Sequence, residues 1–415
     1  MKKALLVLVI FTALAFRIFL SFNSKQGDMY NNLDWGQGMW TYGAAHIYDV
    51  PQHNWPHSWP NQPPGSLYLQ AASSWLAGTI GYLIWHPGIT FKILPSRFIW
   101  WWDVSGPLIL IKLPSILADF VIAWVIYRFG VLWHRPRIAL WVAFIYLFNP
   151  ALWYNSAFWG QTDSLVAAFG LLSVLFLLEG RLFLSPLFLG LSFITKGSWL
   201  PIVPLYLFYW WKNYRPAWPK LLIVPAVFYL LALPFHPHLD LPFWFTRLYL
   251  TRILPGETAW ITVIAFNFWN LFFPASLTPV TTPILGLPAL YWAWSAVAVF
   301  LVLILRYLWQ DSAPHRFVYA VMLLFFAVFL FAPKMLQRYF YPVFPLLSLV
   351  LIFSRRKLYW FIYGLVSFCY LANLYYQWWA PGILALERLY TPLFIKTISI
   401  IYLASFSAFY VQKNV

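Results

Sequence analysis

Long apolar runs separated by short polar clusters occupy most of the chain from residue 4 to residue 411. A helix needs about 20 apolar residues to cross a bilayer, and somewhat fewer where neighbouring helices shield its ends. The runs therefore predict about twelve membrane-spanning helices. In chain order they are 4–22, 108–127, 138–155, 163–179, a hairpin of two short helices over 182–211 that turns at 195–198, 220–235, 284–305, 317–333, 339–353, 358–376 and 396–411.

Two apolar runs need a decision beyond their length. The run 4–22 is longer than a usual signal core and lacks a small-residue cleavage site, so we expect an uncleaved first span. Two long polar segments, 23–107 and 236–283, interrupt the spans. Within the first of them, 66–85 is apolar enough to cross a membrane. We expect it instead to lie along the membrane surface, because inserting it would place Lys112 and Arg128 on the wrong sides.

Basic residues collect in short clusters between the apolar runs. Examples are Lys2 with Lys3, Arg135 with Arg137, Lys212 with Arg215, and 355–357. Cytoplasmic loops carry such an excess, so we place these clusters and both termini inside, and 23–107 and 236–283 on the extracytoplasmic side. The predicted fold class is an all-α polytopic membrane protein forming a single integral domain over 1–415.

Composition agrees with this topology. The chain is 62% hydrophobic and 9% charged, whereas soluble domains carry about 25% charged residues. The net charge of +16 follows from the loop clusters, so it gives no support to a nucleic-acid partner. The single cysteine, Cys369, excludes an intramolecular disulfide and lies in an apolar run, which argues against a thiol nucleophile.

The chain has only 11 acidic residues, and all except Asp119 fall at span ends or between spans. Asp28 and Asp34 follow directly after the first span. Asp28 is the candidate general base, because an anchored, partly buried carboxylate near the interface can take a proton from a hydroxyl. Asp34 would support it or bind an acceptor hydroxyl. The alternative is that both solvate a helix end or cap a turn.

The turn 160–164 (Gly-Gln-Thr-Asp-Ser) joins the third and fourth predicted spans. Asp163 precedes an apolar run and is placed to cap the next helix. With Gln161 it could equally bind sugar hydroxyls or orient Asp28. Asp119, alone at depth, is either a transport carboxylate or paired inside the bundle, for instance with Lys112.

Cations on the outer side run against the charge bias. Lys196, at the tip of the hairpin 182–211, can meet a lipid phosphate at headgroup depth, although snorkelling toward water is the alternative. Lys334 and Arg338 form a second outward turn, where Arg338 suits phosphate contact and could stabilise a departing phosphate.

The histidines of the first long segment lack the i,i+4 pairing of a helical zinc site. We therefore treat them as loop or interfacial residues. No metal site and no cofactor are predicted, although a divalent-metal requirement stays open.

Several stretches together resemble one family. The stretch 27–30 (Gly-Asp-Met-Tyr) is similar to a first-loop Asp element, and 61–65 to a Pro-Pro element that opens a surface helix. The stretch 159–164 closely matches a Trp-Gly-Gln-x-Asp signature, and 265–270 is similar to an Asn-Ala-Phe-Asn-Leu-Trp element. The stretch 335–339 is similar to Met-His-Glu-Arg-Tyr, with Leu and Gln in place of His and Glu. The family is the GT-C superfamily of polyprenyl-phosphate-sugar-dependent glycosyltransferases, especially its bacterial mannosyltransferase-like branch.

The resemblance implies an inverting hexosyltransferase with a GT-C-like bundle. It would move a hexose, with mannose expected, from a polyprenyl-phosphate donor to a lipid-linked or cell-envelope acceptor. The reaction would take place at the extracytoplasmic face of a bacterial cytoplasmic membrane. The residues implied are Asp28 as the catalytic base, Lys196 and Arg338 for the donor phosphate, and Asp34, Gln161, Asp163, Tyr339 and Asn267 for substrate.

A multi-span transporter or lipid flippase is the alternative function. About twelve spans and a positive net charge suit it. Transporters, however, tend to show repeated halves and several ionisable groups at mid-bilayer. Here no internal repeat is visible and Asp119 is nearly alone at depth, so the sequence favours the enzyme.

Overall fold

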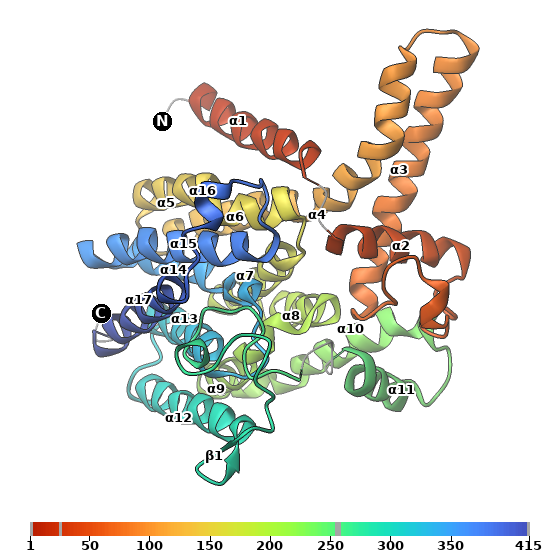
Figure 1. The fold of residues 1–415 in the computed structure, drawn as a ribbon. Helices are drawn as coiled ribbons and strands as arrows, with labels where there is room; N and C mark the ends of the chain where they lie inside the picture. Colours follow the sequence, from red (N-terminus) through yellow and green to blue (C-terminus); the bar gives the residue numbers. More distant parts are fainter. Residues whose placement is uncertain (1–2, 25–26, 254–258, 413–415) are drawn as a thin grey trace.

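The computed structural model describes residues 3–24, 27–253 and 259–412 (Figure 1). Lys2, positions 25–26 of the first predicted outer segment and positions 254–258 of the second lie outside the described residues. Within the described part the chain is almost entirely helical. Its one sheet is a small antiparallel hairpin, β1 (Pro283–Ile284) with β2 (Leu287–Pro288).

The helices carry the labels of Figure 1, with short 3-10 or π-helical turns labelled η. The first half comprises α1 (Lys3–Phe22), α2 (Gly27–Thr41), η1 (Gln52–Asn54), α3 (Pro64–Thr90), α4 (Ser96–Leu132), α5 (Pro136–Phe148), α6 (Pro150–Trp153), η2 (Tyr154–Trp159), α7 (Asp163–Leu178), α8 (Leu184–Thr195), η3 (Gly197–Ile202) and α9 (Val203–Asn213). The second half comprises η4 (Arg215–Leu222), α10 (Ile223–Ala232), η5 (Leu233–Phe235), α11 (Leu241–Leu248), η6 (Tyr249–Ile253), η7 (Trp269–Leu271), α12 (Ala289–Gln310), α13 (Pro314–Phe331), η8 (Gln337–Phe340), α14 (Val343–Phe353), α15 (Lys357–Trp378), α16 (Leu384–Glu387) and α17 (Pro392–Val411).

Every predicted span is helical over most of its length. In the described residues, six helical stretches are long and apolar enough to cross a membrane, or eight if two bent pairs each count as one span. One bent pair is α5 with the α6–η2 segment, which turns by 47°. Shorter apolar helices such as α7 and α8 account for further predicted spans. The predicted all-α membrane fold class is confirmed.

The stretch 66–85, expected to lie on the membrane surface, is part of the longer helix α3. With the first part of α4 it forms a hairpin that projects away from the other helices (Figure 1). α3 is not among the described helices that are long and apolar enough to cross a membrane. Trp75, Tyr82 and Trp100 on this hairpin are exposed, which is typical of aromatic side chains at a membrane interface.

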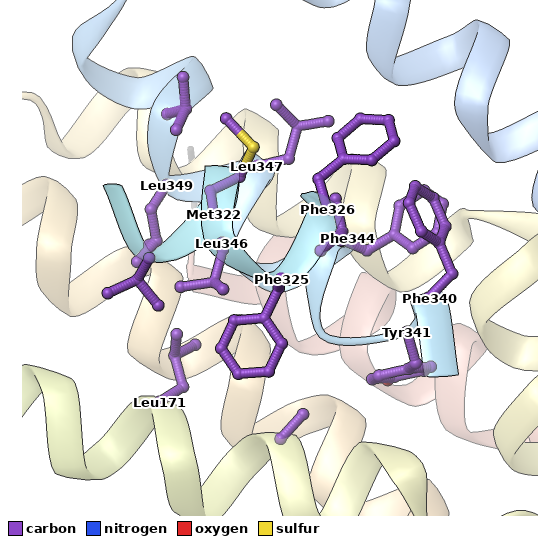
Figure 2. Close-up of a cluster of buried hydrophobic side chains, with 14 of the residues drawn as sticks. Leu171, Met322, Phe325, Phe326, Phe340, Tyr341, Phe344, Leu346, Leu347 and Leu349 are labelled. Carbon is purple, nitrogen blue, oxygen red and sulfur yellow. The ribbon is translucent and has the colours of Figure 1, made fainter. Parts of the chain in front are cut away.

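The centre of the bundle is formed by α13 and α14, whose side chains are nearly all buried. Figure 2 shows how side chains from α7, α13, η8 and α14 fill the space between these helices. The rings of Phe326 and Phe344 each meet Phe340 edge to face, at 5.0 and 5.5 Å between ring centres. This packing fixes η8, the turn before α14, against the core.

Asp119 of α4 is paired inside the bundle, which agrees with the second of the two interpretations of its sequence position. Its carboxylate accepts hydrogen bonds from Arg17 Nε at 2.9 Å, Ser156 Oγ at 2.6 Å and Tyr341 OH at 2.9 Å. The suggested pairing of Asp119 with Lys112 is wrong. Lys112 lies seven residues earlier, about 10 Å along the helix axis, and a side chain from α1 reaches the carboxylate instead.

Candidate active site

Asp28, the predicted base, lies where three segments meet. It occupies the first turn of α2. Its Oδ2 accepts a hydrogen bond from Gln161 Nε2 at 2.7 Å and forms an ion pair with Arg338 Nη1 at 2.9 Å. Gln161 lies between η2 and α7, and Arg338 lies in η8. The structure therefore brings together three of the residues singled out in the sequence, with Asp28 33% exposed at the surface of the cluster.

Lys196 lies beside this group. It follows α8 in extended backbone conformation, and its Nζ is 2.6 Å from Asp163 Oδ1. The ammonium also lies over the ring of Tyr339, 5.9 Å from its centre. Burial lowers the pKa of Lys196; Asp163 opposes that shift, whereas the neighbouring Arg338 adds to it. The cations Lys196 and Arg338 thus lie beside the carboxylates Asp163 and Asp28 within one small region.

Gly160 allows α2 to come this close. Its φ of +85° is in the left-handed region that favours glycine. The N–H groups of Gly160 and Gln161 both donate to the carbonyl oxygen of Asn155, at 3.1 and 3.0 Å. A Cβ at residue 160 would lie 2.8 Å from Met29 Sδ. The tight turn therefore presents Gln161 to Asp28 and leaves room for the start of α2.

Asp163 does not act as a helix cap. It is the first residue of α7, after the cap residue Thr162, and its Oδ1 binds Lys196. In the described part of the chain, Asp163 Oδ2, Thr162 Oγ1 and Trp159 Nε1 are buried without a hydrogen-bond partner. Buried polar atoms are nearly always hydrogen-bonded. These three atoms are therefore positions where hydroxyl groups of a bound molecule would be favoured.

Asp34 lies outside this cluster. It is about 9 Å further along α2 than Asp28, by the helical rise. Its carboxylate is 2.8 Å from His57 Nδ1, and the ring of Tyr30 stacks on that histidine at 5.3 Å. His57 was not singled out as a partner, because the pairing depends on how the loop after α2 folds back.

Asn267 is fully buried away from the Asp28 cluster. Its Nδ2 donates to the carbonyl of Phe329, at 3.3 Å, and its Oδ1 accepts from the N–H of Trp269, at 3.2 Å. These contacts attach the second outer segment to the end of α13. The same segment pairs with Met335 next to η8, where the N–H of Val263 donates to the Met335 carbonyl. Asn267 thereby supports the segment that carries Arg338.

The sequence did not predict the contacts of two buried cations, Arg17 and Lys112. Arg17, in the first apolar run, carried a usable signal, since an ionisable residue inside a span is usually paired or functional. Lys112 donates hydrogen bonds to carbonyl oxygens just before Asp28 and Gly160. Nothing in its local sequence points to those partners.

No group of three or more His, Cys, Asp or Glu among the described residues is placed to hold a metal ion. The histidine with a carboxylate partner in the first outer segment is His57. In the second, His236 pairs with Asp240 at 2.7 Å. The absence of a cofactor stays a prediction.

Comparison with known proteins identifies the fold. No family model and no curated protein sequence matches the chain. The crystal structure of ArnT from Cupriavidus metallidurans bound to undecaprenyl phosphate superposes with a TM-score of 0.53 and 15% identity, covering 100% of this chain and 78% of that one. The apo structure of the same protein gives 0.50 and 14%, with 99% and 76% covered. The chain therefore has the membrane GT-C fold, as the sequence motifs predict.

Proposed function

We propose that the protein is a glycosyltransferase that moves a sugar from a polyprenyl-phosphate donor to an acceptor hydroxyl at Asp28. The observation that carries this proposal is the meeting of Asp28, Arg338 and Lys196 at one end of the helices. The transfer requires a carboxylate that accepts the proton of the acceptor and cations that hold the departing phosphate. The structural similarity to ArnT bound to undecaprenyl phosphate supports the class of donor.

Lys196 and Arg338 would hold the donor phosphate. Arginine presents several N–H donors in a plane that matches phosphate oxygens, and lysine adds a compact charge. As the bond between the anomeric carbon and the phosphate oxygen breaks, the electron pair stays on the phosphate. Cations placed there are most useful where negative charge grows in the transition state.

Asp28 would take the proton from the acceptor hydroxyl. The acceptor oxygen then forms its bond to the anomeric carbon as the phosphate departs from the opposite side, so the configuration inverts. Partial exposure leaves Asp28 open to an acceptor. Its hydrogen bond from Gln161 holds the carboxylate in one orientation, as a base must be within reach of the proton it removes.

Gln161, Asp163 and Tyr339 would contact the sugar, with the unpartnered Asp163 Oδ2 as an acceptor for its hydroxyls. Asp34 with His57 would contact the acceptor further along α2. We propose a hexose, with mannose the first to test, and a lipid-linked or cell-envelope acceptor. The cluster would face the extracytoplasmic side of a bacterial cytoplasmic membrane.

A transporter or lipid flippase is the other candidate. Its deep carboxylate would be Asp119, but Arg17, Ser156 and Tyr341 hold that group. These contacts favour a structural role for Asp119.

The proposal is tested with purified protein in lipid and a panel of radiolabelled polyprenyl-phosphate sugars, mannose and glucose included. Asp28→Asn should lower transfer about 100-fold or more, the usual contribution of a general base. Asp311→Asn, at an exposed carboxylate between α12 and α13, should keep full activity. Full transfer by Asp28→Asn would remove the base assignment, and lipid movement without sugar transfer would favour the flippase.

A further inference from the structure

A cavity of about 750 Å³ lies where α4 passes into α5 and α14 passes into α15. Four basic side chains line it: Arg135, Arg137, Arg355 and Lys357. No acidic residue is among its lining residues. A hollow of this size with four cations has the composition of an anion-binding site.

The cavity is separate from the Asp28 cluster. Arg338 comes before α14 and Ser354, which lines the cavity, comes directly after it. The 11 residues of α14 extend about 16 Å at 1.5 Å per residue. The two sites therefore lie at opposite ends of the same central helix, and one phosphate group cannot occupy both.

Three of the four cations are available to a ligand. Arg135 is committed, since its Nη1 donates to the carbonyl oxygens of Ile352 and Phe353 at 3.2 and 2.9 Å, which fixes the α4–α5 turn to the end of α14. Arg137, Arg355 and Lys357 are exposed, and none forms a salt bridge among the described residues. Like charges gathered without a counter-ion repel one another, and a bound anion would relieve that repulsion.

The starts of two helices add to the positive electrostatic potential at the cavity. α5 begins at Pro136 and α15 at Lys357, both at the cavity, and neither start has a side-chain cap. The N–H groups of a helix start carry partial positive charge.

The remaining lining includes the polar side chains of His134 and Ser354 and an apolar part. Ile138, Leu351 and the ring of Trp360 face the same cavity as the cations. A free phosphate ion would use only the basic part, whereas a phospholipid also has glycerol and acyl carbons to place against the apolar part. From this combination we propose that the cavity binds the phosphate group of an anionic membrane lipid.

The test uses the full-length protein in nanodiscs of phosphatidylcholine with a minor fraction of phosphatidylglycerol. Native mass spectrometry after transfer to detergent counts the retained lipid. The wild type should retain phosphatidylglycerol in preference to phosphatidylcholine. The triple variant Arg137→Gln/Arg355→Gln/Lys357→Gln should lose that preference, with retention falling about tenfold.

A matched control separates a specific site from general attraction to basic loops. Arg215→Gln/Lys220→Gln/Arg306→Gln removes the same charge from exposed positions outside the cavity and should retain the lipid. An equal loss in both triple variants would overturn the proposal. So would tight binding of inorganic phosphate by the wild type with no preference for anionic lipid. Unchanged sugar transfer and melting temperature in the cavity variant would show that it is folded.

Discussion

Lys112 illustrates how a single buried residue can fix the positions of the segments that carry the site. Its ammonium is fully buried and donates to the carbonyl oxygens of Ser21, Ser24 and Phe158 at 3.0 to 3.1 Å, and to Ser24 Oγ at 2.7 Å. Ser24 lies shortly before Asp28, and Phe158 shortly before Gln161. One side chain of α4 thus joins the two chain segments whose relative position sets the geometry around Asp28.

Lys112→Met should therefore lower both stability and catalysis. Each buried carbonyl left without its donor costs about 1–3 kcal/mol. We expect kcat to fall more than KM rises, because Lys196 and Arg338, the proposed phosphate contacts, are on other segments. Melting temperature and steady-state kinetics would check this. Lys220→Met, at an exposed position, is the control; kinetics unchanged in Lys112→Met would refute the positioning role.

The pH dependence of donor binding should report Lys196. Its pKa is lowered mainly by burial, so its ammonium loses the proton at a lower pH than an ordinary lysine. As pH rises through that pKa, Lys196 loses the charge proposed to hold the phosphate, and KM for the donor should increase. Lys196→Arg keeps its charge to higher pH and should move the increase upward. KM measured from about pH 6 to 10 tests this; identical profiles would argue against a phosphate contact.

At the scale of elements, the start of α3 is pressed against the end of α8. A Cβ at Gly65 would lie 2.6 Å from the carbonyl oxygen of Ile194, and Ser66 Oγ donates to the Thr195 carbonyl at 2.6 Å. The next residue is Lys196. The predicted surface helix therefore supports the residue that would hold the donor.

Gly65→Ala should push these helices apart. Overpacking of this kind costs about 1–3 kcal/mol, and displacement of Lys196 should raise the donor KM. Gly78→Ala lies on the same helix in open space; it should leave the donor KM unchanged and raise the melting temperature slightly, because Ala is the better helix former. Melting temperatures and donor KM of both variants provide the test; equal behaviour of the two would mean that the contact has no influence on the site.

Helices were more predictable than their exact limits. α4 begins at Ser96, twelve residues before the predicted span at 108, since Asp103 and Ser105 interrupt the apolar run without breaking the helix. Pro107 lies inside it. Apolar run length marks the part of a helix that crosses lipid, whereas hydrogen bonding continues through polar residues.

The site residues were predictable to the extent that they mark span ends. Asp28, Asp163 and Lys196 stand at or next to helix ends that adjoin apolar runs, where polar residues are conspicuous. Their pairings were not predictable, because Arg338 reaches Asp28 from 310 residues away. Likewise Arg17, rather than Lys112, pairs with Asp119. Such partners follow from helix packing, which local sequence does not specify.

At the scale of the whole molecule, the Arg17–Asp119 ion pair connects several segments inside the bundle. It joins α1 to α4, and through Ser156 and Tyr341 to η2 and the segment before α14. Both charged side chains have no exposure. Removing one partner of a buried ion pair leaves the other charge uncompensated, at a cost of about 3–5 kcal/mol.

Arg17→Met should accordingly lower the melting temperature strongly, and Arg17→Met/Asp119→Leu should recover much of the loss. Cys369 provides the readout, since it is the only cysteine and is buried, so a thiol-reactive dye should label it as the bundle opens. A double variant no more stable than the single one would show that the cost is in packing and not in charge.

The pairing of each carboxylate with a cation has a kinetic consequence. Arg338 holds Asp28 and Lys196 holds Asp163. A donor that draws Arg338 toward itself would release Asp28 and make it a stronger proton acceptor at that moment. Reactants would then bind in a compulsory order, donor before acceptor. Other hydroxyl groups at the membrane would not be deprotonated by Asp28 before the donor binds.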